Sequence, residues 1–181
     1  MRTALLVIDM LNPYDHEHAD VLADRVEPMV AELAGLVDAA SATDDVELVY
    51  VNDNYEDFTA TRHDIVHRAL GGRHPRLVEP IVPADGVDFL QKARHSAFYS
   101  TALDHLLRER GVDTVVLAGQ VTEQCILYTA LDAYVRNFAI RVACDAVASI
   151  DEELGEAALT MMERNMRVEI LSARDCLDDR R

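Results

Sequence analysis

Several features that define other protein classes are scarce or missing in this sequence of 181 residues. There are only three cysteines, Cys125, Cys144 and Cys176, and no two of them form a Cys-x-x-Cys pair. An odd number of widely spaced cysteines makes neither a disulfide framework nor a zinc site. We therefore expect a protein of a reducing compartment, and the simplest prediction is the cytoplasm.

Long apolar runs are also missing. None approaches the roughly 18–20 residues that cross a bilayer, so we expect no membrane association. The N-terminal stretch MRTALLVIDML has one arginine and a short apolar segment that runs into Asp9, with no small-residue cleavage site behind it. This pattern predicts a strand rather than a signal peptide.

Positive charge is scarce as well. The chain has 17 Lys and Arg against 33 Asp and Glu, which gives a formal net charge of −16. Such a field repels a phosphate backbone, so we expect no binding to nucleic acid. The first predicted strand is followed by DMLNPY and not by G-x-G-x-x-G, which argues against a dinucleotide-binding domain.

What the sequence does contain is an alternation of apolar strands and amphipathic helices. Strands are predicted over residues 3–9, 46–53, 87–92, 112–119, 139–146 and 167–171, and helices over 24–40, 101–111, 123–137 and 151–166. Nearly continuous apolar runs such as TALLVID are typical of strands covered on both faces. Strands joined through helices predict a three-layer α/β/α, Rossmann-like fold with a mainly parallel sheet of five or six strands.

Residues 54–86 lack this regular pattern. They contain a Gly71-Gly72 pair and three prolines, Pro75, Pro80 and Pro83. Long irregular segments often carry function, so we predict a lid or substrate loop here.

Polar side chains follow the predicted strands at the ends that should meet. Asp9 ends the first strand, Asn52 and Asp53 end the second, Lys92 ends the third, and Cys125 follows the fourth. Because ligands of open parallel sheets bind outside the carboxyl ends of the strands, we expect these segments to form one site.

Cys125 is the candidate nucleophile among these residues. At the start of the helix 123–137, free N–H groups and the helix dipole favour an anion, so we expect its thiol pKa to be lowered. A neighbouring lysine would act in the same direction, and a carboxylate could take the proton as a general base. Taken singly, these residues have simpler interpretations: a buried cysteine, a turn aspartate and a solvated lysine.

Four segments together resemble the isochorismatase-like cysteine hydrolases, which include nicotinamidases, N-carbamoylsarcosine amidases and ureidoacrylate amidases. They are ALLVIDMLNPY, VYVNDN, KARHSAFYST and the long segment that begins VVLAGQVTEQC. They occur in the family's order over nearly the whole chain. Residues 1–181 are therefore interpreted as a single isochorismatase-like hydrolase domain.

The resemblance implies a catalytic triad of Asp9, Lys92 and Cys125. It also implies a cis peptide between Gln120 and Val121, and an oxyanion hole formed by the N–H groups of Val121 and Cys125. The implied reaction is cleavage of an amide, carbamoyl or ureido C–N bond of a small molecule through a thioester. The alternative is a catalytically idle member that binds a metabolite or a partner protein, but a binder has no need of the whole triad.

The sequence departs from the metal-dependent members of this superfamily. Nicotinamidases carry an Asp-x-His and a later His that hold a metal, whereas the matching place here reads Asp53-Asn54-Tyr55. Three histidines lie downstream, His63, His67 and His74, for which a solvated or loop-stabilising role is the simpler interpretation. We predict no catalytic metal and no other cofactor. True isochorismatases lack the nucleophilic cysteine, so isochorismate is disfavoured as the substrate.

The remaining expectations concern binding and assembly. The candidate substrate-binding residues are Tyr14, Asn52, Asp53, Phe58 and Gln120. Asn52 and Asp53 could instead fix Lys92 and Asp9, and Phe98 could belong to the aromatic wall or to the core. The superfamily commonly forms dimers or larger assemblies, so we expect a homo-oligomer that uses the apolar face of the helix 123–137. Cys144, on a strand predicted to be buried, and Cys176 have no predicted role.

Overall fold

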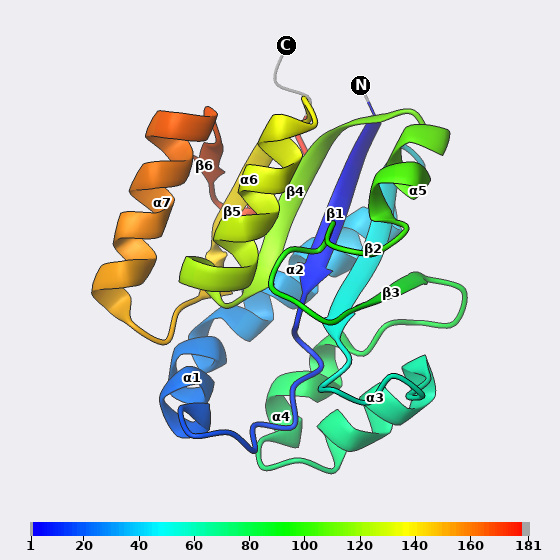
Figure 1. Cartoon of the computed structure of the whole chain (residues 1–181), viewed down its shortest axis with the longest axis vertical. Coiled ribbons are helices and arrows are strands. Elements are labelled where there is room, and N and C mark those ends of the chain that lie inside the picture. The colour runs from blue at the N-terminus through cyan, green and yellow to red at the C-terminus, as the bar shows by residue number, and fades with distance from the viewer. Residues whose placement is uncertain (1, 179–181) are drawn as a thin grey trace.

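A parallel sheet of six strands runs through residues 2–178, the part of the chain that the computed structural model describes (Figure 1). In spatial order the strands are β3 (Asp88–Lys92), β2 (Val46–Asp53), β1 (Arg2–Ile8), β4 (Val112–Gln120), β5 (Ala139–Ala148) and β6 (Glu169–Leu171). Every neighbouring pair is parallel. The predicted α/β fold with a mainly parallel sheet is confirmed, and the sheet has six strands.

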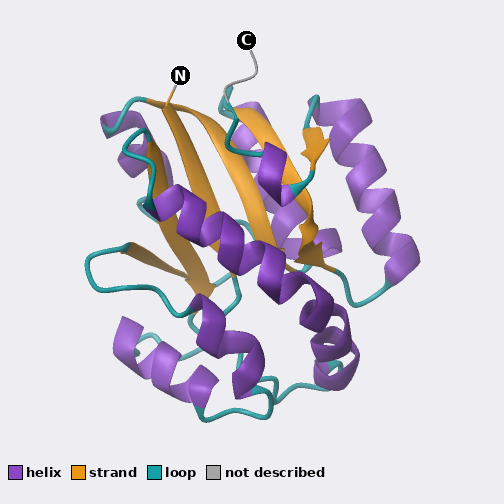
Figure 2. Cartoon of the chain, turned by 180° about the vertical axis from the view of Figure 1, so that it is seen from behind, coloured by secondary structure: helices purple, strands orange, loops and turns teal. Residues whose placement is uncertain are grey.

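Helices cover both faces of this sheet, as Figures 1 and 2 show from opposite sides. One face carries α5 (Leu103–Glu109), α6 (Leu127–Val135) and α7 (Glu152–Met166), and the other carries α1 (Ala19–Val26) and α2 (Val30–Ser41). Each face has its own apolar cluster. Leu5 and Val7 of β1 belong to the α2 side, while Ala4, Leu6 and Ile8 belong to the α6 side. Burial on both faces therefore explains the continuous apolar run of this strand.

The single helix predicted over residues 24–40 is wrong. The chain forms α1, then a 3₁₀ turn over Glu27–Met29, and then α2. Pro28 lies inside this turn and has no N–H to donate, so it cannot continue a regular α-helix. The helical region also begins earlier than predicted, at Ala19.

The segment 54–86 is less irregular than predicted. It contains α3 (Arg62–Leu70), α4 (Pro75–Val78) and a 3₁₀ turn over Glu79–Ile81. Thr61 begins α3 with a capping box, because its side chain accepts from the Asp64 N–H while the Asp64 carboxylate accepts from the Thr61 N–H. Only Ile65 and Ala69 of this helix are fully buried, so its apolar periodicity is weak.

Cys144 is exposed, which contradicts the prediction of a buried strand position. The pairing of β5 with β4 shifts register between the Leu117–Val142 and Gly119–Val147 pairs, and Cys144 lies inside this irregular stretch. A register shift of this kind changes the face of the sheet to which a side chain points, so regular alternation along the strand no longer predicts its burial. None of the helices in residues 2–178 is long and apolar enough to span a membrane.

Candidate active site

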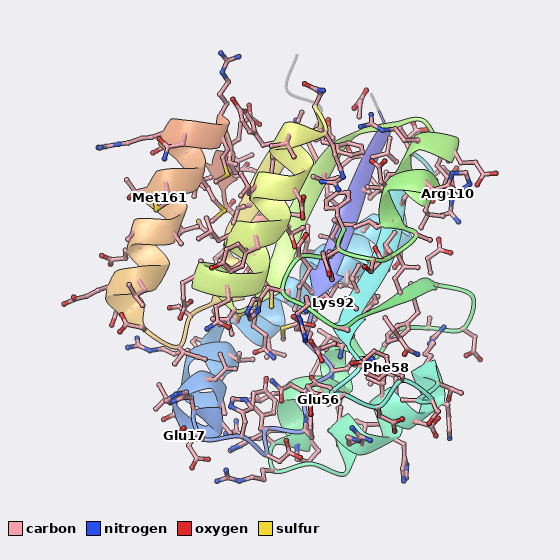
Figure 3. The ribbon with its side chains drawn as sticks, viewed as in Figure 1. Glu17, Glu56, Phe58, Lys92, Arg110 and Met161 are labelled. Atoms are coloured by element: carbon pink, nitrogen blue, oxygen red, sulfur yellow. The ribbon has the colours of Figure 1, made fainter. Side chains whose placement is uncertain are left out.

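Asp9, Lys92 and Cys125 come together at the carboxyl edge of the sheet. Asp9 follows β1, Lys92 is the last residue of β3, and Cys125 lies in a helical turn that follows β4. The Lys92 Nζ lies 2.7 Å from Asp9 Oδ2 and 3.6 Å from the Cys125 sulfur. The Cys125 thiol also hydrogen-bonds the Asp9 carboxylate. Figure 3 shows Lys92 at this edge, with Glu56 and Phe58 beyond it.

The backbone around Asp9 fixes its carboxylate in place. Asp9 adopts a left-handed conformation with φ of 55°, and its N–H donates to the Val51 carbonyl at 3.0 Å. Its Oδ1 accepts from the Asp53 N–H at 2.7 Å, and its carbonyl oxygen accepts from Gln120 Nε2 at 2.7 Å. Both carboxylate oxygens are therefore engaged, one by Asp53 and one by Lys92.

Lys92 is the only lysine in the sequence, and its side chain is 1% exposed. Burial, the largest single influence, acts to lower its pKa. Interactions with Asp9, first of all, and with Cys125 and Asp53 together outweigh burial, and the net effect is a raised pKa. Asp53 contributes from 3.7 Å. A positive charge is thus held beside the Cys125 sulfur at neutral pH.

The segment before Cys125 approaches β1 very closely. Gly119 has φ of 117°, and a Cβ there would lie 2.1 Å from the Ile8 carbonyl oxygen, so only glycine fits. The following peptide, Gln120–Val121, is cis, as the resemblance implies. Thr122–Ile126 then form a π-helical turn, in which the Ile126 N–H donates to the Val121 carbonyl. Such turns occur often at functional sites.

The expected lowering of the Cys125 pKa is wrong. Burial raises the pKa of this thiol, and the neighbouring Asp9 carboxylate raises it further. Lys92 and a hydrogen bond from the Val121 N–H oppose these effects but do not outweigh them. Cys125 is 8% exposed, and it lies in a short π-helical turn rather than in the first turn of a long α-helix. The sulfur is therefore protonated in the resting site.

The carboxylate of Asp9 is suited to accept the proton of this thiol. Burial raises the pKa of its carboxyl group, and Lys92 only partly offsets this effect. A carboxylate with a raised pKa is a stronger proton acceptor than an ordinary aspartate. The site thus pairs a protonated thiol with a base in hydrogen-bond contact.

A cavity of about 360 Å³ lies beside this cluster. Its lining residues are Asp53, Asn54, Glu56, Phe58, Ala93, Arg94 and His95. Phe58 is 78% exposed. The cavity volume is in the range of small-molecule sites.

The candidate substrate-binding residues divide into two groups. Asp53 and Phe58 line the cavity. Tyr14, Asn52 and Gln120 are at most 1% exposed, and their polar atoms bond to protein. Asn52 bonds to the Leu11 N–H and carbonyl, and Gln120 bonds to Asp9 and to the Tyr14 hydroxyl. These contacts fix the segment after β1, so the three residues position the site from behind the cavity.

His95 is the functional candidate that the sequence reasoning missed. Its Nδ1 lies 3.7 Å from the Cys125 sulfur, and its ring stacks on Tyr128 with centroids 5.4 Å apart. The signal that could have revealed it is its place three residues after Lys92, at the same sheet edge. Phe98, by contrast, lies in the core and stacks on Phe138.

No group of three or more His, Cys, Asp or Glu side chains within residues 2–178 lies close enough to hold a metal ion. His63 and His67 stack on α3 with centroids 6.3 Å apart, and His74 contacts Asp20 and the ring of Tyr14. The absence of a catalytic metal remains a prediction.

Comparisons with known proteins agree with this fold. The isochorismatase domain model matches residues 3–175, and the chain belongs to the isochorismatase family of hydrolases. It is 34% identical to the isochorismatase family protein YaaI of Bacillus subtilis (strain 168), over 97% of this chain and 96% of that protein. It is 33% identical to maleamate amidohydrolase of Pseudomonas putida, over 87% of this chain and 78% of that protein.

A solved structure is similarly close. N-carbamoylsarcosine amidase from Thermoplasma acidophilum superimposes with a TM-score of 0.76 at 29% identity, covering 98% of this chain and all of that one (100%). The predicted family membership is confirmed.

Proposed function

We propose that this protein hydrolyses an amide, carbamoyl or ureido C–N bond of a small molecule, with Cys125 as the nucleophile. The observation that carries the proposal is the contact of one thiol with one carboxylate and one ammonium beside a cavity. Relatives named for their substrates, maleamate amidohydrolase and N-carbamoylsarcosine amidase, cleave bonds of this kind.

The first half of the reaction forms a thioester. Asp9 takes the Cys125 proton as the sulfur bonds to the substrate carbonyl carbon, and Lys92 keeps the charge of the site balanced. The developing oxyanion is bound by the N–H groups of Val121 and Cys125. The C–N bond then breaks, and Asp9 returns its proton to the leaving nitrogen. Water hydrolyses the thioester in the second half, releasing the acid and restoring the thiol.

The raised pKa of Cys125 fits this sequence of events. A thiol that stays protonated in the empty site avoids a free buried thiolate. Proton transfer to Asp9 then accompanies attack on the carbonyl instead of preceding it. The base and the nucleophile therefore act as one unit.

The test is an ammonia-release screen over simple amides, N-carbamoyl amino acids and ureido acids. Cys125→Ala should lower turnover by about 10³-fold or more, since the nucleophile is lost. Cys144→Ala is the matched control, because Cys144 is an exposed cysteine on β5, and it should retain full activity. Appreciable turnover by Cys125→Ala would refute the nucleophile. A wild-type protein that binds these compounds without turnover would favour the binding module.

We also propose a homo-oligomer in which α6 contributes to the interface. This helix exposes four large apolar side chains, Tyr128, Leu131, Tyr134 and Val135. Light scattering after size-exclusion chromatography gives the mass directly, and a monomer at micromolar concentration would contradict the proposal. Tyr134→Asp should then shift the mass toward the monomer, because it places a charge on this face.

A further inference from the structure

The side chain of Glu123 ties the turn that carries the nucleophile to a neighbouring loop. Its Oε1 accepts from the Ile150 N–H at 2.9 Å and from the Asp151 N–H at 3.0 Å. Both donors lie between the end of β5 and the start of α7. In the described part of the chain, Glu123 and Cys125 are the two residues of the turn Thr122–Ile126 whose side chains hydrogen-bond other elements.

This contact takes over where the pairing of two strands stops. The last paired residues of β4 and β5 are Gln120 and Ala148. Beyond them both strands end, so no ladder hydrogen bond holds the turn that follows β4. Glu123 lies three residues past Gln120, and its carboxylate binds the chain two and three residues past Ala148. A side chain therefore continues the connection that the backbone makes inside the sheet.

The charge of Glu123 suits this place. Asp151 is the N-cap of α7, a helix of 15 residues, and free N–H groups at a helix start favour a negative charge. The other carboxylate oxygen, Oε2, is buried without a hydrogen-bond partner among the described residues. Such an oxygen is costly to bury, and the two charge-assisted hydrogen bonds at Oε1 offset part of this cost. The carboxylate is thus held through one oxygen, at the loop before α7.

We infer that Glu123 is the positioning residue of the oxyanion hole, an assignment that rests on the proposed function. Val121 precedes it by two residues and Cys125 follows it by two, so Glu123 fixes the middle of the segment that presents both N–H groups. The sulfur has supports of its own, since Lys92 lies 3.6 Å away and Asp9 bonds the thiol. Loss of the Glu123 carboxylate should therefore displace the two N–H donors more than the nucleophile.

Two probes that react with the same sulfur separate these effects. Attack of Cys125 on p-nitrophenyl acetate forms a tetrahedral oxyanion before p-nitrophenolate leaves, and rapid mixing gives the rate of this burst. Iodoacetamide forms an S–C bond at its CH₂ carbon as iodide leaves, so no oxyanion develops. In both reactions Asp9 takes the thiol proton. The ratio of the two rates therefore reports on the oxyanion hole alone.

Glu123→Ala should lower the burst rate by about 10–10²-fold while alkylation stays within about threefold. Glu123→Gln keeps an acceptor oxygen at the same reach, so its burst rate should recover to within about fivefold of the wild type. Glu123→Asp keeps the charge but is one methylene shorter, and it should be as slow as Glu123→Ala. If Glu123→Ala does not fold, Glu123→Asp decides in its place.

Three results would overturn the inference. An unchanged burst rate in Glu123→Ala and Glu123→Asp would show that the carboxylate does not position the donors. A parallel fall of the burst and alkylation rates would show that Glu123 acts on the thiol or on the whole fold. A Glu123→Gln protein as slow as Glu123→Ala would show that its charge acts, rather than its contact with the loop.

The matched control is Arg25→Ala, at the same end of α7. It breaks the exposed pair of Arg25 with Glu152, the first residue of α7, at 2.8 Å and leaves the turn untouched. Both rates should equal those of the wild type. A burst rate that falls as far as in Glu123→Ala would mean that general loosening of this helix end is responsible, and it would also overturn the inference.

Failure of the proposed function gives a different result. If the wild type shows no burst that Cys125→Ala removes, the nucleophile is wrong and the assignment of Glu123 is overturned with it. A burst that depends on Cys125 but not on the Glu123 variants overturns only the assignment of Glu123.

Discussion

Removing the charge of Lys92 should destabilise the protein strongly, although the site is at the edge of the sheet. Lys92→Met keeps the unbranched, apolar stem of the side chain but leaves the Asp9 carboxylate buried without its ion-pair partner at 2.7 Å. Breaking a buried pair from one side costs about 3–5 kcal/mol. Asp9→Asn should cost less, because Asp53 remains 3.7 Å from the ammonium and can still balance its charge.

The double variant isolates the interaction between the two groups. In Asp9→Asn/Lys92→Met no unpaired charge remains, and the asparagine oxygen can still accept from the Asp53 N–H. We therefore expect the double variant to cost no more than Lys92→Met alone. This result corresponds to an interaction energy at least as large as the cost of Asp9→Asn alone, and residues in contact typically show about 0.5–3 kcal/mol.

The pH dependence gives an independent check. Burial already raises the Asp9 pKa above 3.8, and loss of Lys92 removes the charge that holds it down. A carboxyl group whose folded pKa exceeds its unfolded pKa destabilises the fold at pH values above the folded pKa, and this penalty disappears as the group protonates. The deficit of Lys92→Met should thus be largest near pH 7 and smaller at about pH 5.

Urea unfolding at both pH values measures these differences. The matched control is Arg68→Met, which breaks an exposed pair with Asp57 and should cost less than about 1 kcal/mol. The reasoning is refuted if Lys92→Met costs no more than this control near neutral pH. It is also refuted if the costs of the two single variants simply add in the double variant.

Four further predictions concern other parts of the site and fold. Because Lys92 is the only lysine, selective ¹⁵N-lysine labelling gives one Nζ signal, which should show no titration up to its ordinary pKa of 10.5; a transition below that value would contradict the raised pKa. The acid limb of kcat/KM should lie above pH 3.8, because activity is lost as the pH falls and Asp9 becomes protonated. Asp53→Asn should move this limb to lower pH, since the Asp53 charge raises the Asp9 pKa. A limb that does not move argues against Asp9 as the base. Gly119→Ala should cost about 3 kcal/mol or more in thermal or urea unfolding, since its Cβ would meet the Ile8 carbonyl at a positive φ. Gly35→Ala on α2 has open space around it and should instead stabilise the protein by about 1 kcal/mol. Thr61→Ala removes the capping box of α3 and should cost about 1 kcal/mol, and an unchanged urea midpoint would contradict the role of the cap.

The sequence predicted the strands better than the helices. A strand covered on both faces needs an unbroken apolar run, and such a run is visible without knowledge of its neighbours. The helix α3 has only two fully buried residues and depends on a capping box, so its periodicity is weak. The division between α1 and α2 at Pro28 was visible in the sequence, but the apolar spacing on either side obscured it.

The sequence by itself determined which chemistry-bearing residues reach the carboxyl edge of the sheet, because parallel topology brings the ends of β1, β2, β3 and β4 together. Only the tertiary structure decided what those residues are like there. Burial raises the pKa of Cys125 where helix position alone suggested a lower one, and it places Gln120 behind the cavity. The contact between His95 and the sulfur likewise depends on how the loop after β3 packs against α6. Burial, and the distance between residues that are remote in sequence, depend on the packing of the whole fold. No local stretch of sequence therefore reveals them.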